Sequence, residues 1–315
     1  MEISRSEIYL SACAQYIKRK GTKIMEQQYI LKKSKSFEPK HIFECGQCFR
    51  WNREEDDSYT GVFGNNVLNV KKEGNDIIFK GICDGNIQEI CEEYFDLNTN
   101  YEKIKEKLAN IDEHLANSIN YGNGIRILNQ DLWETIISFE ISANNNIPRI
   151  KGIIERICKK YGNEIRWNDK TYYTFPSIQE LSKSNIKELR ELGLGFRDKR
   201  IYDTTQIFLN KEMTLEELIN EKDTEKLREK LLVLPGIGPK VADCILLFSL
   251  KRYEVFPIDV WVRRVMNELY IHNEDEEKVS KKEIQKLARE KYEGLAGLAQ
   301  QYLFYWKREA WGNCL

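Results

Sequence analysis

The pattern of apolar and polar residues divides the chain into a part rich in strands and a part rich in helices. Between about 29 and 96, short β-prone runs such as Val67–Val70 and Ile77–Phe79 are separated by a polar turn at 72–76, which is typical of an antiparallel sheet. After Tyr101, apolar residues recur at helical spacing up to the end of the chain. Strands followed by helices predict an α+β fold.

Two helices in the second part have local signals of their own. Asp131 and Glu134 form an Asp-x-x-Glu cap for a helix expected over 131–143. Another helix is expected over 185–192, directly before a loop that contains two glycines.

The most informative segment is a predicted helix-hairpin-helix at 226–250. Its first helix has amphipathic spacing and stops at a Pro-Gly pair, and the second begins at Pro239. Between them, Gly236 and Gly238 can take backbone angles barred to other residues, and they leave main-chain N–H groups open to a ligand. Such a turn is a ready anion site, with a plain turn between two helices as the structural alternative.

Lys240 is the candidate nucleophile of this hairpin. On a helix that starts at Pro239, Lys240 and Cys244 are one turn apart and share a face. A lysine at a helix N-terminus opposes the positive end of the dipole, so a purely structural role would be unusual. Positive surroundings and desolvation both favour the neutral, nucleophilic amine. The alternative is an ordinary surface lysine.

Asp259 is the candidate partner of Lys240. It follows an extended X-Pro dipeptide and precedes a helical pattern, where it would be the N-cap. Capping alone would explain an aspartate here. A carboxylate held by backbone N–H groups nevertheless stays ionised, and it can stabilise a cationic sugar or assist proton transfer.

These segments resemble the helix-hairpin-helix DNA glycosylases, specifically the bifunctional 8-oxoguanine DNA glycosylase/lyase branch. In that branch a hairpin lysine attacks the anomeric carbon to give a Schiff base, and a later aspartate assists. The resemblance implies that Lys240 and Asp259 excise 8-oxoguanine from double-stranded DNA and nick the strand by β-elimination, as in base excision repair. It implies no metal and no cofactor.

The resemblance extends to a pocket for the flipped base. The segment Cys45–Trp51 resembles the family's Gly-Gln-x-Phe-Arg-Trp motif, in which the glycine carbonyl accepts the N–H that distinguishes 8-oxoguanine from guanine; Gly46 takes that role. Near the end of the chain, Gln300 would bond the Watson–Crick edge of the base. Phe304 and Cys244 would stack on its two faces.

Other segments resemble the family's DNA contacts. Asn144 would fill the gap left in the duplex, and Arg149 would contact the orphaned cytosine. Phe196 would be a wedge, with Arg197 as a second cytosine-reading arginine. Seven residues are thus expected to contact DNA: Asn144, Arg149, Phe196, Arg197, Gly236, Gly238 and Trp261.

Two positions depart from the family pattern. Trp261 stands where the family usually has a phosphate-binding histidine, so an aromatic wall is kept but a titratable phosphate ligand is lost. Pro148 interrupts the segment between Asn146 and Arg149, which is expected to change the aim of the arginine.

Composition adds few constraints. The chain of 315 residues can bury a sizeable core. A net charge of −1 does not by itself suggest DNA binding, although a small footprint gripped by backbone N–H groups and a local basic face needs no global charge. The eight cysteines are scattered. Only Cys45 and Cys48 form a close pair, which favours free thiols in a reducing compartment. We therefore expect a cytoplasmic protein, associated with the nucleoid in a bacterium.

We expect three parts along the chain: a flexible tail at 1–28, with Met25 as an alternative start, an antiparallel β-sheet domain at 29–120, and a helical glycosylase region at 121–315. No run of about eighteen apolar residues is present, so no membrane partner is expected. The protein is expected to be monomeric.

Two other functions remain open from the sequence. A monofunctional alkylbase glycosylase of the same superfamily shares the fold and the aspartate but activates water and lacks the hairpin lysine. A non-catalytic hairpin module that only binds DNA needs neither the pocket glutamine nor Asp259.

Overall fold

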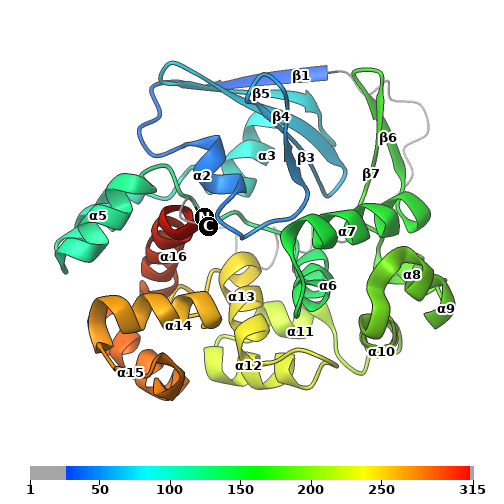
Figure 1. Ribbon diagram of the computed structural model, residues 1–315. Helices are drawn as coiled ribbons and strands as arrows, with labels where there is room; N and C mark the ends of the chain where they lie inside the picture. The colour runs from blue at the N-terminus through cyan, green and yellow to red at the C-terminus, as the bar shows by residue number, and fades with distance from the viewer. Residues whose placement is uncertain (1–25, 313–315) are drawn as a thin grey trace.

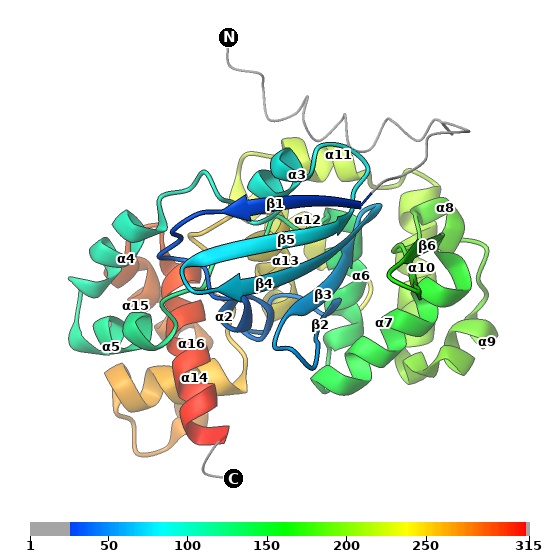
Figure 2. The same cartoon turned by 90° about the horizontal axis from the view of Figure 1, so that it is seen from above.

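The computed structural model describes residues 26–312. Its N-terminal part contains one antiparallel sheet with the spatial order β1-β5-β4-β3-β2 (Figure 2). The strands are β1 (Glu26–Leu31), β2 (Trp51–Arg53), β3 (Tyr59–Phe63), β4 (Asn66–Glu73) and β5 (Asp76–Ile82). The two runs expected as strands lie in β4 and β5, which pair up to Glu73 opposite Asp76 across the expected turn.

The sheet begins earlier than the sequence suggested. Residues 26–28, expected in the flexible tail, belong to β1, where Glu26 lies opposite Ile82 of β5. The rest of the expected tail, with Met25, lies outside the described residues.

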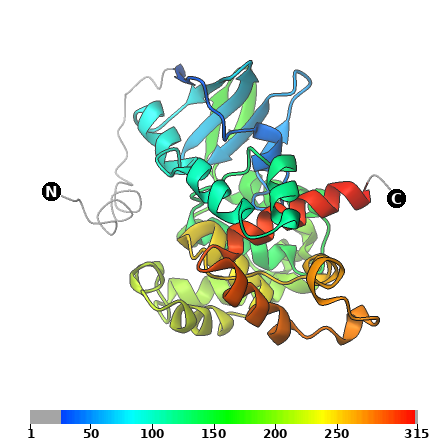
Figure 3. The same cartoon turned by 90° about the vertical axis from the view of Figure 1, so that its left-hand side faces the viewer.

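Helices surround and follow the sheet, and Figures 1 and 3 show the strands on one side of the molecule with most of the helices below them. They are α2 (Pro39–Phe43), α3 (Ile87–Tyr94), α4 (Tyr101–Ala109), α5 (Glu113–Tyr121), α6 (Leu132–Ser142), α7 (Ile147–Tyr161), α8 (Ile178–Leu181), α9 (Ile186–Leu189), α10 (Asp198–Leu209), α11 (Leu215–Asn220), α12 (Thr224–Leu232), α13 (Pro239–Leu250), α14 (Val260–Met266), α15 (Lys281–Tyr292) and α16 (Ala296–Gly312). Within the described chain, none of them has both the length and the apolar character needed to cross a bilayer.

Of the two helices predicted from local signals, the one over 131–143 is confirmed and the one over 185–192 only in part. Asp131 caps α6, because its side chain accepts a hydrogen bond of 2.8 Å from the Glu134 N–H. The helix expected over 185–192 is shorter. Helix α9 ends at Leu189 and gives way to a wider turn over Arg190–Leu194, in which Gly193 has a φ of +94°.

A small hairpin inside the helical part was not expected. Strands β6 (Glu164–Trp167) and β7 (Lys170–Tyr173) pair across Asn168 and Asp169. Both turn residues have positive φ, +52° and +57°, as the tightest hairpin turns require and as Asn and Asp tolerate. The aromatic and β-branched residues on both sides of the Asn-Asp pair are a pattern from which this hairpin could have been predicted.

Helix α13 lies at the centre of the helical part. Every residue from Val241 to Ser249 is buried, so this helix is covered on all sides rather than being amphipathic. Phe248 stacks on Phe139 of α6 with ring centroids 5.5 Å apart. On another side, the Arg228 Nε of α12 donates to Asp243 Oδ1 at 2.7 Å.

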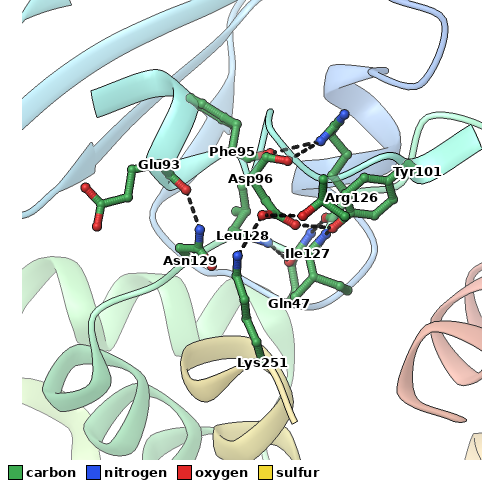
Figure 4. A network of polar contacts seen from close by, with 11 residues as sticks. Gln47, Glu93, Phe95, Asp96, Tyr101, Arg126, Ile127, Leu128, Asn129 and Lys251 are labelled. Carbon is green, nitrogen blue, oxygen red and sulfur yellow. Dashed lines mark hydrogen bonds and ion pairs between the residues drawn. The ribbon is translucent and has the colours of Figure 1, made fainter. Parts of the chain in front are cut away.

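An ion pair joins α13 to the N-terminal part. Lys251, which follows α13 in a left-handed conformation, places its Nζ 2.6 Å from Asp96 Oδ1 (Figure 4). The buried Asp96 carboxylate also accepts from the hydroxyl groups of Thr99 and Tyr101. The contact fixes the C-terminal end of α13 to the loop between α3 and α4.

We predict that Lys251→Met lowers the free energy of unfolding by about 1–3 kcal/mol, because it leaves a buried carboxylate without its counter-charge. Lys32→Met is the matched control, since Lys32 pairs with Asp76 at 2.7 Å with 67% of its side chain exposed, and such pairs contribute below about 1 kcal/mol. Urea unfolding of both variants measures the difference. Equal losses would mean that the Asp96 pair is no stronger than a surface contact.

Candidate active site

The hairpin turn uses its two glycines differently. Gly236 has a φ of +82°, and a Cβ there would lie 2.5 Å from Arg200 Cδ, so only glycine fits. Gly238 has a φ of −95°, so only Gly236 uses the wider backbone freedom of glycine. Among residues 26–312, a Cβ at Gly238 would meet nothing within 4 Å, and no side chain caps α13. The helix N-terminus is therefore open to a ligand, as an anion site requires.

Lys240, Cys244 and Asp259 form one electrostatic group. Lys240 is half-buried in the first turn of α13, with its Nζ 5.7 Å from the centroid of the Phe139 ring. Cys244 is 4% exposed. Burial raises the pKa of its thiol to about 11, while the Lys240 ammonium opposes this shift and the Asp243 and Asp259 carboxylates add to it. The buried thiol is thus influenced by the charges of both predicted catalytic side chains.

Asp259 is the N-cap of α14, as predicted. Its Oδ1 accepts a hydrogen bond of 2.8 Å from the Val262 N–H. Across residues 26–312, no hydrogen bond or ion pair uses the other oxygen, Oδ2, and none joins Asp259 directly to Lys240. Capping therefore fixes the orientation of the carboxylate while one oxygen is left for a further contact.

Gly46 and Phe304 meet, although they are far apart in the sequence. Gly46 has a φ of +85°, and a Cβ there would lie 3.6 Å from Phe304 Cε1 of α16. Gln300, one turn before Phe304, is 4% exposed. Its Oε1 accepts a hydrogen bond of 2.8 Å from the Gln301 Nε2, so Gln301 orients the glutamine expected to read the base.

Arg308, like Gln301, supports the expected base pocket, although the sequence analysis did not identify it. Its Nη2 donates to the Glu44 carbonyl, and its guanidinium carbon lies 5.3 Å from the centroid of the Phe304 ring. It therefore fastens α16 to the segment that carries Gly46. The i, i+4 spacing of Phe304 and Arg308 was the only signal.

Arg197 is bound to backbone carbonyl groups in this structure. It is 2% exposed, and its Nη2 donates to the carbonyl oxygens of Ala143 and Asn144, both at 2.6 Å. Desolvation lowers the pKa of Arg197. These bonds hold the loop in which the exposed Asn144 takes a φ of +51°. In this structure Arg197 shapes that loop, and its contact with cytosine stays a prediction.

Arg149 lies at the surface, as expected. Its Nη2 is 3.5 Å from the Gly193 carbonyl, and its N–H donates to Asn146 Oδ1, the cap of α7, at 3.0 Å. Pro148 lies in the first turn of α7, where proline is tolerated. It therefore does not interrupt the segment that ends at Arg149.

Phe196 is the exposed aromatic side chain expected of a wedge, with 56% of its surface accessible. The guanidinium carbons of Arg197 and Arg200 lie 4.2 Å and 5.2 Å from its ring centroid. Arg200 also packs against Gly236, so it links the wedge to the hairpin. Trp261, half-buried in α14, lies 5.8 Å from the Arg264 guanidinium.

A buried carboxyl group lies behind these arginines. Glu140 of α6 is fully buried, and Thr204 of α10 donates to its Oε1 at 3.4 Å. Burial raises the pKa of Glu140 to about 8, opposed by that hydrogen bond and by the Arg200 charge.

A lysine at the open N-terminus of a buried hairpin helix, together with an aspartate that caps a later helix and acts on the same buried cysteine, is the arrangement of a helix-hairpin-helix DNA glycosylase. Residues 29–136 match the family model "8-oxoguanine DNA glycosylase, N-terminal domain". Residues 137–291 match "HhH-GPD superfamily base excision DNA repair protein". The chain belongs to the 8-oxoguanine DNA glycosylase branch of this superfamily.

Individual relatives agree with this assignment. The N-glycosylase/DNA lyase of Saccharomyces cerevisiae is 33% identical over 73% of this chain and 67% of its own length. The 8-oxoguanine glycosylase/lyase of Clostridium acetobutylicum, bound to double-stranded DNA with cytosine opposite 8-oxoguanine, is 41% identical with a TM-score of 0.85, covering 91% of this chain and 98% of its own. MBOgg1 in complex with a low-affinity DNA ligand is 43% identical with a TM-score of 0.85, covering 93% and 98%.

We predict that Gly46→Ala reduces excision of 8-oxoguanine by about tenfold, and strand cleavage at a pre-formed abasic site by less. A Cβ at Gly46 would make ordinary van der Waals contacts with Phe304, so crowding is not the expected cause. The expected cause is the positive φ, which costs an alanine about 1–2 kcal/mol and so favours a rotation of the peptide that carries the Gly46 carbonyl. Single-turnover rates on the two substrates measure the effect. Equal losses would show that Gly46 acts through folding or DNA binding.

We predict that Glu140→Gln stabilises the protein more at pH 8.5 than at pH 5. Because the folded pKa lies above the unfolded one, the wild type loses stability as pH rises between them, and glutamine does not titrate. The difference should reach about 1 kcal/mol or more. Urea unfolding at both pH values tests this, with the exposed Glu229→Gln as control. A pH-independent gain would contradict the raised pKa.

Proposed function

We propose that this protein excises 8-oxoguanine from duplex DNA and then cuts the strand, with Lys240 as the nucleophile that displaces the base and, as the resulting imine, as the group that makes the β-elimination possible. The observation that carries the proposal is the grouping of Lys240, Cys244 and Asp259 at the open end of α13. The names of the yeast and clostridial relatives, a glycosylase/lyase in each case, support the same reaction.

The expected course of the reaction follows from this arrangement. A base inside a duplex is out of reach, so the damaged nucleotide is turned out into the pocket. The Lys240 amine attacks the anomeric carbon as the base leaves, and an imine forms between the sugar and the lysine. The Asp259 carboxylate stabilises the cationic sugar. Loss of the proton next to the imine then expels the 3′ phosphate by β-elimination.

The alternative functions are less well supported. A monofunctional glycosylase that activates water has no use for a lysine beside Cys244. A binding module has no use for a buried Gln300 held by Gln301. Both catalytic side chains and the pocket residues come from one chain, which supports a monomer as the active form. The buried free thiols within the described part support a reducing location such as the cytoplasm.

A nicking assay tests the proposal. Duplexes with 8-oxoguanine opposite each of the four bases, and an undamaged duplex, are incubated with the protein and analysed for cut strands with and without hot alkali. The proposal predicts cutting of the lesion strand without alkali. Cutting only after alkali would indicate a monofunctional glycosylase, and binding without cutting a non-catalytic module.

We predict that Lys240→Gln keeps lesion binding but lowers base release and strand cutting by more than about a thousandfold, because an amide is not a nucleophile. Gel-shift affinity and single-turnover rates measure the two effects. Base release at the wild-type rate would remove Lys240 from the mechanism.

We predict that Asp259→Asn leaves stability nearly unchanged, since Asn caps helices about as well as Asp. Cleavage should fall by about 100-fold or more, because the charge that stabilises the sugar is lost. Thermal unfolding and single-turnover cleavage are compared. A variant that loses stability and activity in proportion would show that Asp259 is only a cap.

A further inference from the structure

We propose that Gln47 is a positioning residue for lesion recognition: its side-chain amide fixes the direction of the Gly46 carbonyl. This inference rests on the proposed function and on the role that the family resemblance implies for Gly46, whose carbonyl is expected to read the damaged base.

The Gln47 side chain is fully buried, and all its polar atoms are bonded. Its Nε2 donates to the carbonyl oxygens of Ile42, at 2.9 Å, and Arg126, at 2.7 Å. Its Oε1 accepts from the Leu128 N–H at 2.9 Å. A buried amide that uses both donors and its acceptor has one orientation, because any rotation leaves a polar atom unpaired.

The fixed orientation of the Gln47 side chain determines the direction of the Gly46 carbonyl. The Gly46 carbonyl and the Gln47 N–H belong to the same planar peptide, so fixing the Gln47 Cα fixes one end of that plane. Gln130 holds the next peptide, because its Nε2 donates to the Gln47 carbonyl at 2.7 Å. Gly46 itself has a φ of +85° and no side chain to anchor it. The direction of its carbonyl therefore depends on its neighbour.

The carbonyl is placed where a base can meet it. No hydrogen bond donated from within residues 26–312 reaches the Gly46 oxygen. The aromatic ring of Phe304, expected to stack on the base, lies against the same glycine.

The segment that holds Gln47 is itself held by hydrogen bonds, which Figure 4 shows. The Arg126 guanidinium donates to the carbonyl oxygens of Asp96, at 2.6 Å, and Ser36, at 2.8 Å. The Ile127 N–H donates to the Tyr101 hydroxyl at 2.9 Å. Because Asp96 also binds Lys251 at the end of α13, the Gly46 carbonyl and the Lys240 helix are held by the same group of residues.

Loss of the Gln47 amide should therefore affect one substrate more than another. A carbonyl displaced by about 1 Å loses the hydrogen bond from the extra N–H of the lesion, and such misplacement costs up to about 100-fold in rate. A pre-formed abasic site has no base to read, so its cleavage should change little.

The experiment compares single-turnover rates of 8-oxoguanine excision and of abasic-site cleavage in the full-length protein. For Gln47→Leu, the ratio of the two rates should fall by about tenfold or more. Tyr94→Phe is the control, because it removes only the buried hydroxyl that accepts from Trp51 Nε1. Within residues 26–312 no hydrogen bond joins that hydroxyl to Gly46 or to the 126–128 segment, so the ratio should stay unchanged. If Gln47→Leu does not fold, Gln130→Leu replaces it, with an expected fall of about threefold.

Two results would overturn the proposal. An equal loss on both substrates would mean that Gln47 acts through folding alone, and an unchanged ratio would mean that the carbonyl is held in another way. A wild-type protein that cuts abasic DNA but leaves 8-oxoguanine in place would instead refute the proposed substrate.

Discussion

The burial of α13 from Val241 to Ser249 is the constraint on which the rest of the site depends. A helix covered from Val241 to Ser249 cannot rotate or slide without losing packing along its whole length. The two ends of α13 can therefore have different functions. The N-terminal end presents Lys240 beside Cys244, and the C-terminal end is tied through Lys251 to Asp96. The Lys240 side chain is flexible, but the backbone that carries it is thus held in place.

The pocket for the base is assembled across the two parts of the chain. The N-terminal part supplies Gly46, and α16 supplies Gln300 and Phe304. Arg308 fastens these pieces together through the Glu44 carbonyl. Because the contacts are between backbone groups and buried side chains, the relative position of the two parts is set by directional hydrogen bonds as well as by apolar packing. This suits a site that separates two bases differing by one N–H group.

Whether a feature could be predicted from the sequence depends on how far apart in the sequence its interacting residues lie. The hairpin, the Asp259 cap and the Asp131 cap follow from residues close in sequence, and all three are confirmed. The contact of Gly46 with Phe304 is long-range, and only the family resemblance pointed to it. Burial of Arg197 against two carbonyls could not be predicted, since nothing local distinguishes a buried arginine from an exposed one.

The unexpected residues have the same explanation. Arg308 and Gln47 act through partners far along the chain, and spacing does not show such contacts. Gln301 binds the side chain of its neighbour Gln300, a contact that depends on the side-chain conformations of both residues. The β6–β7 hairpin differs, because its Asn-Asp turn was visible in the sequence and was passed over among helical patterns.

The central claim is that the Lys240 amine bonds to the sugar of the damaged nucleotide. The most direct measurement is reduction with borohydride during reaction with an 8-oxoguanine duplex, followed by digestion and mass spectrometry of the peptide attached to DNA. The account predicts one attached peptide, with the modification on Lys240 at the start of α13. Base release without attachment, or attachment at another amine, would contradict it.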